Sequence, residues 1–123
     1  ALSTVSGVSH GLANAIMMPP AIRFNAAAVG ERAGDVARAL GARDESAEGA
    51  ARAVEELARR IDLPTKLSAA GVVEAHLRPL VEKAMADGCH GCNLRAVTAA
   101  DMEALFREVA TQAVGTTRSC PRN

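Results

Sequence analysis

A histidine followed directly by a glycine, at the start of an apolar segment, is the feature of this chain best suited to metal chemistry. Ser9 stands where it can cap a helix that begins around His10 and Gly11. The positive end of a helix disfavours imidazolium, and neutral imidazole is the form that binds metal ions. Gly11 adds no side chain that would crowd an ion. The residues alone leave two interpretations open: His10 is a metal ligand, or it is a polar neighbour of a helix cap.

A second group with possible chemistry is the Cys-x-x-Cys motif formed by Cys89 and Cys92, with His90 between them. Such a motif is compatible with a zinc site or with a redox dithiol. A zinc site would need a further pair of ligands at suitable spacing, and only Cys120 and His76 are available. A small zinc or redox protein is therefore one hypothesis. The alternative for Cys92 is that it serves as a small buried hydrophobic residue.

Helical periodicity recurs along the chain, and strand alternation is nearly absent. The two prolines at 19–20 should kink the first helix or restart it, and Pro79 should bend a later one. Gly41 should end the second helix, Ser46 should cap the third, and residues 87–97 should form a loop. We predict a compact all-α bundle of five to six helices in a single domain over residues 1–123, with a loose tail at 115–123. The expected helices are 9–24, 31–40, 47–61, 73–86 and 98–113, the last opened by a Thr98–Asp101 capping box.

The helix expected at 47–61 has the clearest amphipathic pattern, and Leu57 is predicted to lie at the centre of its buried face. Its opposite face should be solvated and carry three acid-first pairs, Glu48–Arg52, Glu55–Arg59 and Glu56–Arg60. The methionines, His76 and Arg23 are expected to have structural roles rather than functional ones. We expect Met17, Met18 and Met102 to fill the core, His76 to lie at the surface or boundary, and Arg23 to form a cap or ion pair rather than to bind phosphate.

The composition narrows the class of protein. Apolar residues make up 49% of the 123 residues, and 14 basic residues balance 14 acidic ones, so neither a nucleic-acid partner nor a membrane partner is expected. Three cysteines, an odd number, favour a reducing cytoplasm over a disulfide scaffold. Aromatic residues make up only 2%, and alanine is abundant, which favours closely packed helices. The first residue is alanine, which would fit a processed or excised piece of a longer protein and would equally fit removal of an initiator methionine.

Several segments, in collinear order, resemble the iron-containing (group III) alcohol dehydrogenases. Residues 10–16, His-Gly-Leu-Ala-Asn-Ala-Ile, and the later Arg-Phe-Asn at 23–25 are similar to the segment that carries the last iron-binding histidine of that family. Residues 88–95, Gly-Cys-His-Gly-Cys-Asn-Leu-Arg, resemble its Cys-x-x-x-Asn-Pro-Arg loop. The chain departs from the family where Ser9 and Leu94 replace prolines. Further similarity is found at 37–41, 61–65 and 98–109.

The resemblance implies the C-terminal part of the helical domain of a dehydroquinate-synthase-like fold. The family holds Fe²⁺ or Zn²⁺ with an aspartate and three histidines, and only His10 carries over as a metal ligand. Cys89 carries over as a residue lining the substrate pocket, with Asn93 and Arg95 shaping the loop. No catalytic or cofactor-binding residue carries over.

The complete enzyme would use NAD(P) to interconvert an alcohol and an aldehyde or ketone. This chain alone should bind no cofactor tightly and should be inactive. Its expected partner is the nucleotide-binding half, or a second copy of itself. A helical interaction module without catalytic activity remains the alternative, beside the zinc or redox protein based on Cys89 and Cys92.

Overall fold

In a computed structural model, residues 1–110 are described, and all of their regular structure is helical. The elements are α1 (Leu2–Ser6), α2 (His10–Val29), α3 (Arg32–Ala39), α4 (Ala47–Arg60), the 3₁₀ segment η1 (Ser68–Ala70), α5 (Glu74–Ala86), the 3₁₀ segment η2 (Gly88–Cys92) and α6 (Ala99–Ala110). The predicted all-α class is confirmed for these residues. The tail expected at 115–123 and the end of the last helix lie outside them.

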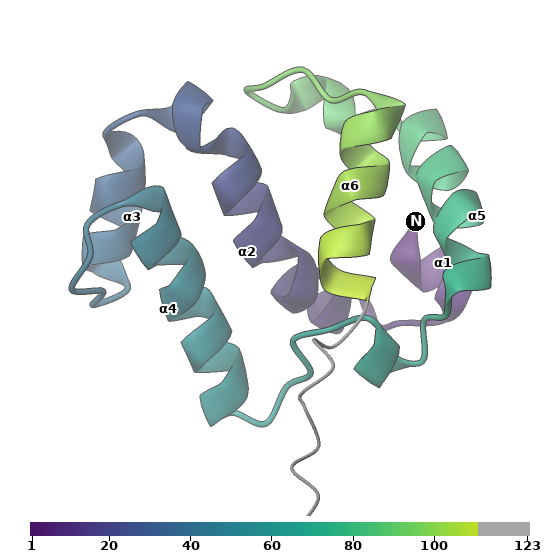
Figure 1. Ribbon diagram of the computed structural model, residues 1–123, viewed down its shortest axis with the longest axis horizontal. Helices are drawn as coiled ribbons and strands as arrows, with labels where there is room; N and C mark the ends of the chain where they lie inside the picture. The colour runs from purple at the N-terminus through teal and green to yellow at the C-terminus, as the bar shows by residue number, and fades with distance from the viewer. Residues whose placement is uncertain (111–123) are drawn as a thin grey trace, which may run out of the picture.

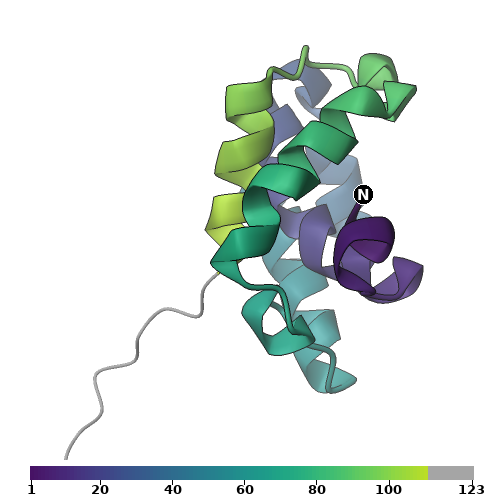
Figure 2. The ribbon, with the colours of Figure 1, turned by 90° about the vertical axis from the view of Figure 1, so that its right-hand side faces the viewer.

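Helix α2 runs through the middle of the molecule and separates two groups of helices (Figure 1). On one side it packs against α4, which also contacts α3. On the other side it packs against α6, which is joined to α5, and α5 in turn contacts α1. In the view of Figure 2, α5 crosses in front of the bundle with α1 beside it. A site along α2 can therefore be lined by residues from either of the two groups of helices.

The two groups are packed with side chains of different size. Around α1, α2, α5 and α6 the core consists of larger residues such as Ile16, Leu80 and Phe106. Between α2, α3 and α4 the buried residues are mostly alanines, and Ala37, Ala50 and Ala51 have no exposed surface. Small side chains let helix axes approach closely, which agrees with the expectation from the alanine content. Gly49 of α4 lies so close to the carbonyl of Asp44 that a Cβ could not fit there without a backbone shift.

Several local predictions are confirmed. The hydroxyl of Ser46 accepts a hydrogen bond from the backbone N–H of Gly49 at 3.1 Å, which caps α4. Asp101 Oδ2 accepts from the backbone N–H of Thr98 at 3.0 Å, and the Thr98 hydroxyl accepts from the backbone N–H of Asp101 at 3.1 Å, so the capping box before α6 is present. Gly41 follows the end of α3 with φ of 74°, a left-handed conformation that glycine adopts at low cost.

The first long helix differs from its prediction. α2 continues without a restart through Pro19 and Pro20 and ends at Val29 rather than at Phe24. Both prolines are buried and line one small cavity together with Ala58 of α4 and Val109 of α6. Tertiary packing on both sides thus holds the helix in spite of the two missing N–H donors. The short helix α1, which precedes it, was not predicted.

The assignment of faces on α4 is also wrong at Leu57, and Ile61 at the end of the predicted helix is exposed as well. Leu57 is 49% exposed, whereas Ala50, Ala51 and Ala58 are buried. The contact with α2 is centred on these alanines, and Leu57 lies at the edge of the stripe. Met18 is likewise exposed rather than core, while Met17 and Met102 pack at the margin of the core.

Candidate functional site

A groove of about 610 Å³ follows α2 and is walled by residues of η2 and α6. His10 and Cys89, which are far apart in the sequence, both line it. Its walls are largely apolar, with Met17, Phe24 and Phe106 among them. The structure therefore places the predicted ligand and the predicted pocket residue on the same side of the domain. It also adds Asn14, Asn25 and Asp87, which the sequence analysis did not single out as polar groups of one site.

His10 is the first residue of α2, and it is exposed. Its Nε2 lies 3.2 Å from Nδ2 of Asn14, one turn along the helix. When Nδ1 carries the ring proton, the Asn14 amide donates to the Nε2 lone pair and fixes the orientation of the imidazole. Ser9 occupies the N-cap position as predicted, but its side chain makes no capping hydrogen bond. The polar support of His10 therefore comes from Asn14 and not from the cap.

Cys89 lies in η2, where the Asp87 carboxylate begins the 3₁₀ turn by accepting a hydrogen bond from the Cys89 backbone N–H at 3.2 Å. A hydrogen bond with the same carboxylate, followed by its negative charge, raises the pKa of the Cys89 thiol. Hydrogen bonds from Cys89 lower the pKa of Asp87 in return. Cys92 is exposed and also lines the groove. The alternative that Cys92 is a buried hydrophobic residue is therefore wrong.

The segment after η2 is fastened to α2 by two side chains. Asn93 Nδ2 donates to Asn25 Oδ1 at 2.8 Å and to the carbonyl of Arg95 at 2.6 Å. The guanidinium of Arg95 lies 3.9 Å from the ring centroid of Phe24 and donates to the carbonyl of Phe24 at 3.1 Å. These contacts, a cation–π interaction among them, set the position of the cysteine segment against the groove. Phe24 and Asn25 thereby join a helix turn to a loop about seventy residues later.

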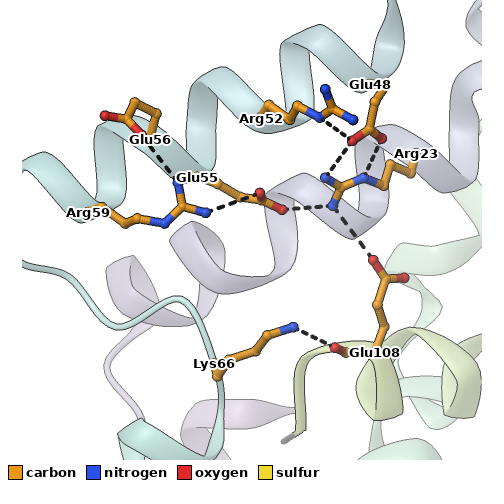
Figure 3. A network of polar contacts seen from close by, with 8 residues as sticks. All are labelled: Arg23, Glu48, Arg52, Glu55, Glu56, Arg59, Lys66 and Glu108. Atoms are coloured by element: carbon orange, nitrogen blue, oxygen red, sulfur yellow. Dashed lines mark hydrogen bonds and ion pairs between the residues drawn. The ribbon is translucent and has the colours of Figure 1, made fainter. Parts of the chain in front are cut away.

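Among the described residues, Arg23 has three carboxylate partners, and Figure 3 shows that they come from two other helices. Its guanidinium donates to both oxygens of Glu48 at 2.7 and 3.1 Å and to Glu55 at 2.8 Å. Glu108 of α6 lies 3.7 Å away. These bonds, led by the one to Glu48, raise the pKa of Arg23 above its ordinary value.

The expected ion pair at Arg23 is therefore confirmed. Glu48 and Glu55 also pair with Arg52 and Arg59, as predicted, but they are not merely a solvated face, because both turn toward α2. The third pair differs, since Glu56 contacts Arg59 at 3.2 Å.

The donor set available for a metal ion is small. Among residues 1–110, no three histidine, cysteine, aspartate or glutamate side chains gather where one ion could bind them. Protein sites for zinc use three or four protein ligands. His10 can thus supply one ligand of a site, but it cannot form that site with its own neighbours. The zinc hypothesis for Cys89 and Cys92 lacks its further ligands within the same range.

His76 is half-buried, which agrees with its predicted boundary position. Its Nδ1 accepts a hydrogen bond from the backbone N–H of Val73 at 3.2 Å. Within the described part of the chain, no helix has both the length and the apolar character needed to cross a membrane.

Comparison with known proteins gives one consistent result. The family model described as Fe-containing alcohol dehydrogenase family, C-terminal, matches residues 1–110. The chain is 35% identical to the lactaldehyde reductase of Escherichia coli K12 over 103 residues, which cover 79% of this chain and 27% of that protein. It is 33% identical to the 4-hydroxybutyrate dehydrogenase of Cupriavidus necator, with 84% and 28% covered. It is 32% identical to the 1,3-propanediol dehydrogenase of Klebsiella pneumoniae, with 80% and 27% covered. The chain thus spans just over a quarter of the length of these relatives.

Proposed function

The chain belongs to the iron-containing alcohol dehydrogenase family, and from this membership we propose that it forms the helical, metal- and substrate-facing part of an NAD(P)-dependent alcohol dehydrogenase. The complete enzyme would interconvert an alcohol and an aldehyde or ketone. The observation that carries the proposal is that His10 and Cys89 line one apolar groove. We place this activity in a reducing cytoplasm, on the evidence of the odd number of cysteines.

His10 would supply one imidazole ligand to Fe²⁺ or Zn²⁺, and the remaining ligands would come from the nucleotide-binding half. For this role the Asn14 amide would be turned over, so that its oxygen accepts from Nε2–H and holds the ring while the lone pair of Nδ1 binds the ion. When bound, the ion would polarise the substrate oxygen, and the nicotinamide would exchange hydride with the substrate carbon.

The groove residues of this chain would bind and orient the substrate. Cys89, held by the turn at Asp87, would contact a small alcohol or aldehyde, and Phe24 and Phe106 would exclude water from it. Asn93 and Arg95 would keep the loop in place through their bonds to α2. The apolar walls also support docking of the nucleotide-binding half over the groove, or association with a second copy in its absence. The isolated chain would then be inactive.

The test is a segment exchange. This chain replaces the matching segment of the Escherichia coli lactaldehyde reductase, and lactaldehyde turnover is measured after circular dichroism and gel filtration have established that the chimera is folded. We expect turnover in the chimera, its loss in His10→Ala, and its retention in His76→Ala, the matched histidine control that lies outside the groove. A folded chimera without turnover, or one in which His10→Ala keeps full activity, would contradict the proposal.

A further inference from the structure

The second cysteine of the Cys-x-x-Cys motif has no part in the function proposed above. Cys92 shares three properties with Cys89: both are exposed, both have free thiols, and both line the groove. An exposed pair of thiols three residues apart can react in ways that a single substrate-lining cysteine cannot.

The backbone of η2 places the two cysteines one turn apart. Residues 88–92 form a continuous 3₁₀ segment, and the N–H of Asn93 closes it on the carbonyl of His90 at 3.1 Å. A 3₁₀ helix rises about 2.0 Å per residue with three residues per turn, so side chains three apart eclipse one another. The two Cα atoms are thereby placed about 6 Å apart on one side of the turn. A disulfide has a Cα–Cα distance of about 4.4–6.8 Å, and this range includes that value. It also needs Cβ atoms about 3.5–4.5 Å apart, so oxidation must draw the two eclipsed side chains together by about 2 Å.

Hydrogen bonds at the two ends of η2 can confine this change to the turn itself. Asp87 fixes the start of the turn through the backbone N–H of Cys89, and Asn93 fixes its end through Asn25. Neither of these bonds uses a sulfur atom, so both can persist after oxidation. The contact that oxidation removes is the one between the Cys89 thiol and the Asp87 carboxylate.

We propose that Cys89 and Cys92 form a reversible disulfide, which makes this edge of the groove a site of oxidative modification by peroxide. One thiolate attacks a peroxide oxygen, the O–O bond breaks, and one water leaves together with a sulfenic acid on that sulfur. The other thiol attacks the sulfenic sulfur, the S–S bond forms, and a second water leaves. Both sulfurs are oxidised by one electron each, and one peroxide is reduced to two waters. A dithiol reductant reverses the reaction by exchange.

Peptide mapping of the whole chain tests the proposal directly. Trypsin cuts after Lys83 and Arg95, so residues 84–95 form one peptide that contains both cysteines, while Cys120 falls in another. After treatment with one equivalent of hydrogen peroxide, we expect this peptide to lose two hydrogen masses. We expect dithiothreitol to restore them, with unchanged circular dichroism and no cross-linked dimer at any protein concentration. A peptide that stays reduced, or that appears cross-linked to the Cys120 peptide or to a second chain, would overturn the proposal.

A variant pair tests the part played by the turn. Asp87→Asn removes the carboxylate that raises the pKa of Cys89, so the disulfide should form several-fold faster at neutral pH. Glu82→Gln is the matched control, because Glu82 is an exposed carboxylate of α5 that pairs with Arg78 instead. It should leave the rate unchanged. Equal rates in Asp87→Asn and the parent would refute this role of the turn. Zinc that stays bound to both thiols during dialysis against a chelator would count against the disulfide itself.

Discussion

The cluster around Arg23 holds α2 against α4 and α6, and replacing this arginine by methionine should destabilise the fold. Methionine keeps most of the aliphatic stem and removes the charge and all five donors. The Arg23 side chain is only 28% exposed, and Glu55 beside it is similarly covered. The substitution therefore leaves a half-buried carboxylate without its partner from α2.

The magnitude follows from the bonds that are lost and those that remain. A hydrogen bond to a charged group contributes about 1.5–3 kcal/mol. Glu48 would keep Arg52 at 2.9 Å, and Glu55 would keep Arg59 at 3.6 Å, so the loss is less than the sum of the bonds. We expect Arg23→Met to lower the free energy of unfolding by about 2 kcal/mol.

Arg52→Met is the matched control for this measurement. Arg52 contacts the same Glu48, but its side chain is 70% exposed and its bond lies within α4. Its removal should cost about 0.5 kcal/mol or less. Both variants are compared with the parent in urea, with unfolding followed by far-ultraviolet circular dichroism. Equal losses in the two variants would refute the reasoning that Arg23 joins the helices.

Three further outcomes are expected. Leu80→Ala should cost about 2–5 kcal/mol in the same urea assay, because Leu80 is fully buried, whereas the half-exposed Leu57→Ala should cost about 1 kcal/mol or less. Gly49→Ala should lower the melting temperature although alanine favours helices, because its Cβ would meet a backbone carbonyl. The hydrogen bonds from Thr98 lower the pKa of Asp101, so its contribution to stability is present above the unfolded value of about 4 and is lost as the pH falls through the folded value. When the free energy of unfolding is measured as the pH is lowered below about 4, it should therefore fall less in Asp101→Asn than in the parent.

Local chemistry in the sequence was sufficient to predict the ends of several helices. Ser46, Gly41 and the Thr98–Asp101 pair act within four residues of their own positions, so their roles follow from the neighbouring sequence alone. The continuity of α2 does not follow in this way, because Pro20 is held by packing against α4 and α6. α1 was missed, although its closing glycine at position 7, with φ of 71°, was a signal available in the sequence.

In the candidate site, too, some features depend on neighbouring residues and others on residues far away in the sequence. His10 could be singled out from its glycine and its helix start, and Asn14 lies one turn away at a spacing that reasoning from sequence could have used. The bond between Asn25 and Asn93 joins residues that are 68 positions apart, so no local pattern predicts it. The exposure of Leu57 depends on how closely α2 and α4 approach, which periodicity alone does not fix.

The central claim is that His10 is a metal ligand of a site completed by the nucleotide-binding half. Its most direct test is the metal content of the folded chimera with lactaldehyde reductase, measured by inductively coupled plasma mass spectrometry after loading with Fe²⁺ or Zn²⁺ and gel filtration. We expect close to one ion per chimera, a large loss of bound metal in His10→Ala, and no loss in His76→Ala. A folded His10→Ala chimera that retains its metal as well as the parent does would contradict the claim.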